Sequence, residues 1–145
     1  MIYHEKFMCE WTTEEGNVEH KYYFLRLKNN TRAILNIRIW TVKETVARLT
    51  IRLAWFHKYP YDLEAEVRRI EILGDKIFYV SPYDVVKILD YVPFKTLKRD
   101  EIDISNLDNV LRFIDNISRY FSDKAKNDLD RLVRNLRSYE SYEEY

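Results

Sequence analysis

The chain has 145 residues, of which 46% are hydrophobic and 33% are charged, and its formal net charge is zero. This length predicts a single domain over 1–145 with a sizeable core. The charge balance argues against a protein that binds nucleic acid through overall basicity, and the sole cysteine, Cys9, excludes an internal disulfide. No signal peptide or run of transmembrane length is visible, so we expect a cytoplasmic protein without membrane contact.

The composition is unusual in three residue types. The chain lacks Gln, has only 2 Gly and contains 12 Tyr. Together with abundant Glu, Lys, Arg and Ile, this composition is typical of a protein from a hyperthermophile. AT-rich codon usage is the plainer explanation, and the two are compatible.

The first 28 residues allow two interpretations. In one, YHEKFMCEW pairs with VEHKYYFLRL as a β-hairpin across the turn EEGN. In the other, Thr12 and Glu15 form a capping box, and Val18, Tyr22 and Leu25 lie along one side of the helix that follows. The glycine of EEGN suits a turn better than a helix. Both interpretations stay open.

The segment from Thr31 to Lys58 carries the strongest periodic signal. Seven apolar residues follow one another there at alternating spacings of four and three, as on one face of a helix: Leu35, Ile39, Val42, Val46, Leu49, Leu53 and Phe56. Two strands are the alternative, because the segment is rich in β-branched and aromatic residues. Strict alternation fails at Ile34-Leu35 and at Val46-Ala47, so we predict one long central helix over 31–58, surrounded by other helices.

The chain after this segment also shows helical spacing. Leu63, Val67, Ile70 and Leu73 predict a helix that Gly74 ends. The alternative is a hairpin in which RRIEIL pairs with KIFYVS. We predict the helix.

The segment Ser81-Pro82-Tyr83-Asp84 is a strong helix start. Ser81 can cap, Pro82 suits the first turn and Asp84 is favourable near a helix N-terminus. We expect this helix to end at Pro93. Its apolar face consists of Val85, Ile88, Leu89 and Val92.

Two further helices are predicted near the C-terminus. Ser105 and Ser122 are their expected start points. The first has the apolar stripe Leu107, Leu111, Ile114, Ile117 and Phe121, and the second has Leu129, Leu132, Val133 and Leu136. The predicted fold is therefore mostly α, a helical bundle around the 31–58 helix, with a possible small N-terminal β-hairpin.

No pattern of catalytic or metal-binding residues stands out. His4, His20 and His57 have no partner at metal-ligand spacing, and the two glycines are too far apart for a phosphate loop. The serines at predicted helix starts are explained as caps, and none lies in a nucleophile motif. We expect no enzyme activity, no cofactor and no metal.

A basic surface is one candidate binding site. It consists of Arg38, Lys43, Arg48 and Arg52. With Trp40 and Trp55 these residues offer charge and aromatic contact to nucleic acid. The alternative is a solvated edge of the helix, with arginine stems lying over apolar surface.

The C-terminal tail, 138–145, is a second candidate surface, predicted to be flexible and acidic. Its residues are Tyr139, Glu140, Tyr142, Glu143, Glu144 and Tyr145. Their carboxylates can occupy basic grooves built for phosphates, and their rings can lie against arginine. The alternative is a frayed, soluble terminus.

The length, the Gln-free and Tyr-rich composition and the stripe TRAILNIRIWTVKETVARLTIRLAWF together resemble a small family of viral proteins. These are the RNA polymerase inhibitor protein of Acidianus two-tailed virus and its virion-protein relative. The resemblance implies a helical, non-catalytic viral regulator. Such a regulator docks in the DNA-binding channel of archaeal RNA polymerase and inhibits transcription in the host cytoplasm, or it is a structural protein of the virion.

Charge favours such docking in one segment. Residues 59–104 contain ten acids against seven bases, and these acids can compete with phosphate for a basic channel. Direct nucleic-acid binding through the basic surface is the second expectation for function.

Overall fold

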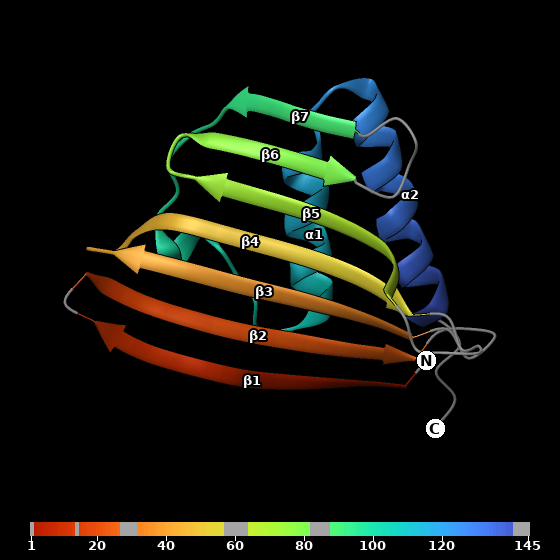
Figure 1. Ribbon diagram of the computed structural model, residues 1–145, viewed down its shortest axis with the longest axis horizontal. Coiled ribbons are helices and arrows are strands. Elements are labelled where there is room, and N and C mark those ends of the chain that lie inside the picture. Colours follow the sequence, from red (N-terminus) through yellow and green to blue (C-terminus); the bar gives the residue numbers. More distant parts are fainter. Residues whose placement is uncertain (1, 14, 27–31, 57–63, 82–87, 141–145) are drawn as a thin grey trace.

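The computed structural model describes residues 2–13, 15–26, 32–56, 64–81 and 88–140, with side chains in 15–26, 32–55, 67–81 and 88–137. Within these ranges seven strands come first and two α-helices follow (Figure 1). The strands are β1 Ile2–Thr13, β2 Gly16–Arg26, β3 Arg32–Val42, β4 Thr45–Phe56, β5 Glu64–Leu73, β6 Lys76–Ser81 and β7 Ile88–Pro93. A short 3-10 helix, η2 (Arg99–Glu101), precedes α1 (Leu107–Ser118) and α2 (Asp123–Glu140). The chain is mostly β, so the predicted helical bundle is wrong.

The strands form one antiparallel sheet in the order β1 to β7, in which each strand pairs with its neighbours in sequence. Lys43 and Glu44 form the β3–β4 turn with φ of 49° and 67°, the two positive values of a type I′ hairpin. Gly74 has φ of 58° in the β5–β6 turn. A Cβ on Gly16 would lie 2.1 Å from the Thr41 carbonyl oxygen, so only glycine fits beside β3.

The segment 31–58, predicted as one long helix, contains the β3–β4 hairpin instead. The predicted stripe does mark core positions, because five of its members are at most 5% exposed: Leu35, Ile39, Val46, Leu49 and Leu53. The predicted helical period was wrong because the turn and a β-bulge each shift the alternation of inward and outward residues along the strands. Trp40 pairs with Arg48, but the next residue, Thr41, pairs with Val46, which leaves Ala47 as an extra residue. The bulge therefore creates the helix-like spacing of three between Val46 and Leu49.

Two more predicted helices are strands. The helix predicted over 63–73 is wrong because 64–73 is β5, and its alternative, the hairpin of RRIEIL with KIFYVS, is confirmed as β5–β6. The helix predicted over 81–93 is wrong at its C-terminal end, where 88–93 is β7. Its start, 82–87, lies outside the described residues. In both segments the outer face of the strand also carries apolar residues, such as Leu73 and Leu89, and together with the inner-face residues they produce helical spacing.

The sequence predictions for the two ends of the chain agree better with the structure. The N-terminal hairpin is confirmed as β1–β2, and the two C-terminal helices are confirmed as α1 and α2. Asn106, rather than Ser105, caps α1 by accepting a hydrogen bond from a backbone amide in its first turn. Ser122 caps α2 in the same way. Since α2 continues to Glu140, the first three residues of the predicted flexible tail are helical, and 141–145 lie outside the described residues.

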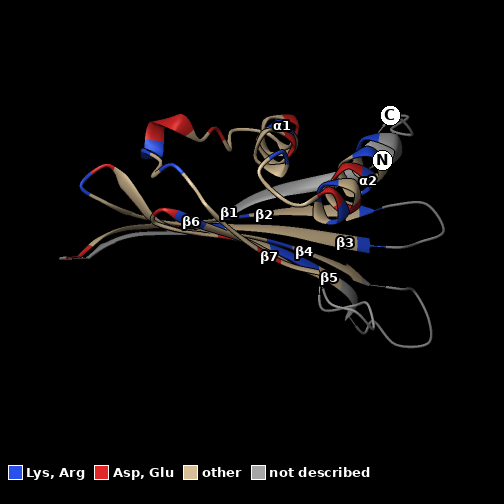
Figure 2. Ribbon diagram, turned by 90° about the horizontal axis from the view of Figure 1, so that it is seen from above, with Lys and Arg blue, Asp and Glu red and all other residues tan. Residues whose placement is uncertain are grey.

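Both helices and the connector before them, 94–106, lie against one side of the sheet (Figure 2). We call this side the inner face and the opposite side the outer face. Alternate strand residues point into the inner face and form one core cluster with α1 and α2. Tyr23, Tyr79, Leu49 and Leu111 are among its largest fully buried side chains. Burial of such apolar surface is the main source of stability for this two-layer arrangement.

A buried ionic cluster fixes α2 to the inner face. Asp128 of α2 is 5% exposed and accepts hydrogen bonds from the Nε of Arg68 at 2.9 Å, from the Tyr79 hydroxyl and from Arg131. Burial alone would raise the pKa of Asp128, but the hydrogen bonds from Tyr79 and Arg68 outweigh it and hold this pKa below its usual value. Asp128 is therefore ionised at neutral pH and compensates the buried guanidinium of Arg68.

Polar residues of β2 fix the connector to the same face. The buried Nζ of Lys21 donates to the carbonyl oxygen of Ile104 at 2.7 Å, and the Tyr23 hydroxyl donates to the same oxygen at 2.8 Å. Arg99 of η2 pairs with Glu19 at 2.9 Å. The inner-face polar residues of β2 therefore anchor the connector to the sheet.

Candidate nucleic-acid interface

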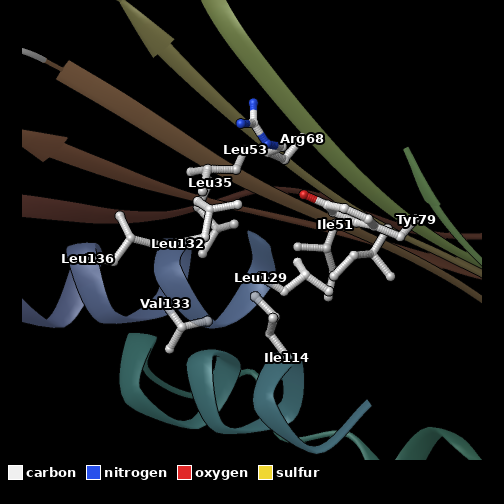
Figure 3. A pocket seen from close by; sticks show the side chains of 11 residues that line it. Leu35, Ile51, Leu53, Arg68, Tyr79, Ile114, Leu129, Leu132, Val133 and Leu136 are labelled. Carbon is white, nitrogen blue, oxygen red and sulfur yellow. The ribbon is translucent and has the colours of Figure 1, made fainter. Parts of the chain in front are cut away.

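A cavity between the sheet and the helices is too small for a ligand. It measures about 20 Å³ and its surface is apolar, although Arg68 and Tyr79 are among the residues that line it (Figure 3). A single water needs about that volume, whereas small-molecule pockets measure roughly 300–1,000 Å³. Within the described part of the chain, no group of three or more His, Cys, Asp or Glu could hold a metal ion. No described helix is long and apolar enough to cross a membrane.

The outer face is strongly basic. Side chains alternate between the two faces of a sheet, and Ile37, Ile51 and Ile70 share one cross-strand row in the inner-face core with Tyr79. The register then sets which residues of β2–β7 point outward. Seven of them are cationic: Arg26, Arg32, Arg38, Arg48, Arg52, Arg69 and Lys76. Among the described side chains of these strands, Glu71 is the outward carboxylate.

The inner face of the same strands is balanced by comparison. Among the described side chains, its charged residues are two cations, Lys21 and Arg68, and two carboxylates, Glu19 and Asp90. All four contact the helices or the connector. The excess of positive charge on β2–β7 is therefore a property of the outer face.

Three cross-strand pairs place one basic residue directly opposite another: Arg26–Arg32, His20–Arg38 and Arg52–Arg69. Like charges in such pairs repel, because directly opposed Cβ atoms lie only about 4.5–5.5 Å apart. The consequence is visible at His20, whose pKa is lowered by burial and by the charge of Arg38.

Glu71 organises two of the arginines. Its carboxylate lies 2.6 Å from Arg48 and 3.3 Å from Arg69, and it accepts a hydrogen bond from Thr50. Glu71 is 15% exposed, while the side chains of Arg48 and Arg69 are 53% and 45% exposed. The carboxylate thus orients both guanidinium groups and leaves about half of each side chain open to a ligand.

Aromatic side chains lie on the outer face beside the arginines. Tyr22 and Phe24 stack in β2, with ring centroids 5.9 Å apart and an interplanar angle of 14°. Phe78 of β6 and Tyr91 of β7 form a second pair, with centroids 5.0 Å apart. Trp40 also points outward, opposite Arg48. Charge and exposed aromatic rings therefore share one surface.

The structure brings together three of the four residues predicted from sequence as a basic surface. Arg38, Arg48 and Arg52 all point to the outer face, although they lie on strands and not on a helix. Lys43 is exposed in the β3–β4 turn. Trp55, predicted to join them, packs against the inner-face core instead.

The side chains of the second predicted surface, the C-terminal tail 138–145, lie outside the described residues. Tyr139 and Glu140 belong to the backbone of α2, but their side chains lie outside the described residues. The remaining members lie outside them entirely: Tyr142, Glu143, Glu144 and Tyr145.

The described acids predicted to favour docking between 59 and 104 are divided between the two faces of the sheet and the connector, where Asp100, Glu101 and Asp103 lie close together in sequence. Glu71 pairs with outer-face arginines, Asp90 accepts a hydrogen bond from Ser122 on the inner side, and Asp103 accepts one from the backbone of Ser105 in the connector. Each has a local structural role.

Sequence reasoning missed the residues of this surface that lie outside the 31–58 segment. These are His20, Tyr22, Phe24, Arg26, Arg69, Lys76, Phe78 and Tyr91. The alternation of Tyr22 and Phe24 with buried neighbours was a usable signal, but linking them to Arg69 requires the pairing of four strands. A scan of protein-family models, a search of curated proteins and a search of solved structures found no match to this chain.

Proposed function

We propose that this protein is a non-catalytic nucleic-acid-binding protein whose outer sheet face binds the sugar-phosphate backbone. The observation that supports this proposal is the outward charge of β2–β7, where the described side chains include seven cations and one carboxylate. Neutralisation of phosphates by Lys and Arg supplies most of the affinity of sequence-independent binding.

The arrangement of the arginines suits the phosphates of a nucleic acid better than it suits the carboxylates of an irregular protein surface. Arg38, Arg52 and Arg69 lie on three adjacent strands, and strands are about 4.8 Å apart. Their planar guanidinium groups can each form two parallel hydrogen bonds to phosphate oxygens. A chain of phosphates crossing the strands would place negative charge between the opposed basic pairs.

Binding is measured by fluorescence anisotropy with labelled DNA and RNA, single-stranded and duplex, between about 50 and about 200 mM salt. The test variant replaces Arg38, Arg52 and Arg69 together by Ala. The matched control removes the same charge from the helix side, by replacing the exposed residues Lys124, Lys126 and Arg134 of α2 by Ala. Circular dichroism confirms that both variants keep the fold.

We expect affinity to fall steeply with salt in the unmodified protein and in the α2 control. In the outer-face variant the slope of log K against log salt should become shallower by about 2 to 3, because each lost phosphate contact contributes about 0.7 to 0.9. No binding at low salt, or an equal loss in the two triple variants, would overturn the proposal.

Docking in the channel of archaeal RNA polymerase stays a prediction. Such a channel is basic because it holds phosphates, so the outer face would be repelled from its walls. The contact would have to involve other surfaces, such as the tail 138–145. A promoter transcription assay with the tail deleted separates this mechanism from nucleic-acid binding, since the tail is not part of the outer face that we assign.

A further inference from the structure

The aromatic pairs lie at the two ends of the basic region. On the outer face the strand register forms two neighbouring rows that cross the sheet. One row runs Tyr22, Asn36, Arg52, Arg69, Val80 and Leu89 from β2 to β7. The other runs His20, Arg38, Thr50, Glu71, Phe78 and Tyr91. Tyr22 and its stacking partner Phe24 therefore lie at the β2 end, and Phe78 with Tyr91 lies at the β6–β7 end.

The rings at both ends are accessible from solvent. Tyr91 is 51% exposed, and its neighbour Leu89 is 67% exposed. Tyr22, Phe24 and Phe78 are partly exposed. With a strand spacing of about 4.8 Å, the four steps from β2 to β6 span about 19 Å. The arginines of β3, β4 and β5 fill the interval between the two aromatic pairs.

We infer that the ligand of the outer face is a single-stranded nucleic acid, lying across the strands with bases stacked on the two aromatic pairs and phosphates on the arginines between them. This inference rests on the proposed function and specifies its ligand. Unpaired bases can stack on exposed aromatic rings whatever their sequence, whereas the bases of a duplex are already stacked on one another. A duplex would use the arginines and leave the rings unused.

The positive charge of the outer face favours a single-stranded nucleic acid over a second copy of the chain as its ligand. Two outer faces brought together would oppose seven cations to seven, with one carboxylate on each side. Such like-charge contact disfavours self-association through this face. A single strand supplies both the anionic groups and the flat apolar groups that the surface can contact.

The test compares an oligonucleotide of about 20 nucleotides with its own duplex, by fluorescence anisotropy at the same salt concentration. The variants are Tyr22→Leu and Tyr91→Leu, which keep apolar bulk but remove the aromatic ring. Tyr120→Leu is the matched control, because Tyr120 is 43% exposed and lies in the turn between the helices on the other side of the sheet. Circular dichroism checks folding.

We expect the unmodified protein to prefer the single strand. Tyr22→Leu and Tyr91→Leu should each weaken single-strand binding by about 5-fold to 100-fold, the usual contribution of one stacked base. Their salt dependence and duplex affinity should not change, because no charge is removed. Tyr120→Leu should bind like the unmodified protein.

Failure of this inference can be told apart from failure of the proposed function. Equal binding of single strand and duplex, with loss only in the Arg38, Arg52 and Arg69 triple variant, would overturn the inference and leave the proposed function standing. Equal weakening by Tyr22→Leu and Tyr120→Leu would also overturn it. No binding of either form at low salt would overturn both.

Discussion

Replacing Asp128 by Asn should destabilise the protein by about 3–5 kcal/mol. The side chain keeps its shape, so the change removes charge without creating a cavity. The Arg68 guanidinium, whose side chain is 6% exposed, then stays buried without the carboxylate that now lies 2.9 Å from its Nε. The Tyr79 hydroxyl also loses a charged acceptor. The large magnitude follows because a buried uncompensated charge costs more than the lost ion pair contributes.

The measurement is urea unfolding at pH 7, followed by circular dichroism. Arg131→Ala is the matched control, because it removes a different partner of Asp128 whose side chain is 62% exposed. That control should cost between about 0 and 1 kcal/mol. Replacing Arg68 and Asp128 together by Met and Leu should recover most of the loss. A loss below about 1 kcal/mol for Asp128→Asn, or one equal to that of Arg131→Ala, would refute the reasoning.

The same residue predicts a pH dependence with a definite sign. The folded-state pKa of Asp128 lies below its usual value of 3.8. Its contribution to stability is therefore fully present above that value and is lost as pH falls through the folded-state pKa. Unfolding curves measured from pH 7 to about pH 2 should show this loss, beginning near pH 3.8, in the unmodified protein and a smaller one in Asp128→Asn. A parallel pH dependence in both proteins would contradict the assignment.

Three further predictions concern single residues. Leu49→Ala should cost about 2–5 kcal/mol in urea unfolding, because Leu49 is fully buried in the sheet, and a loss near zero would place it outside the core. Glu71→Gln should raise nucleic-acid affinity in anisotropy, since it removes the carboxylate that offsets Arg48 and Arg69; weaker binding would mean that orientation of the arginines matters more than charge. Because burial and Arg38 lower the pKa of His20, affinity should gain from its protonation only below pH 6.5, and His20→Ala should lack that gain.

The core could be predicted from sequence better than the secondary structure. Leu35, Ile39 and Leu49 were identified as buried, and they are. The error lay in treating neighbouring apolar residues as a failure of alternation. Ile34 and Leu35 do alternate: Leu35 packs against the helices, while Ile34 is partly exposed on the outer face. An outer face that is itself rich in apolar side chains hides the period of two from the sequence.

The helices at the C-terminus were predictable because their environment is simple. Each packs one side against the inner face and exposes the other to solvent, so α1 and α2 keep a clear apolar stripe. The strands before them have no such contrast. Their assignment depends on pairing with the neighbouring strands and on packing against the helices, which the pattern within one segment does not contain.

Part of the basic surface was predicted correctly despite the wrong secondary structure, and the reason is geometric. Arg48 and Arg52 are four residues apart, which is about one turn of a helix and also two full repeats of a strand. They share a face under either interpretation. Arg69 and the aromatic residues of β2, β6 and β7 join them only through the register of the sheet, so they could not be found without the fold.

The zero net charge of the chain, which argued against electrostatic binding, is a poor guide to this surface because the fold separates the charges. The carboxylates of α1, α2 and the connector lie on the inner side, beyond the sheet (Figure 2). The packed layers of a protein are about 10 Å apart, and the Debye length at physiological salt is about 8 Å. A ligand on the outer face therefore responds mainly to the seven cations and to Glu71 beside it. In a thin two-layer fold, the charge of one side acts mainly on a ligand at that side, whatever the net charge of the whole chain.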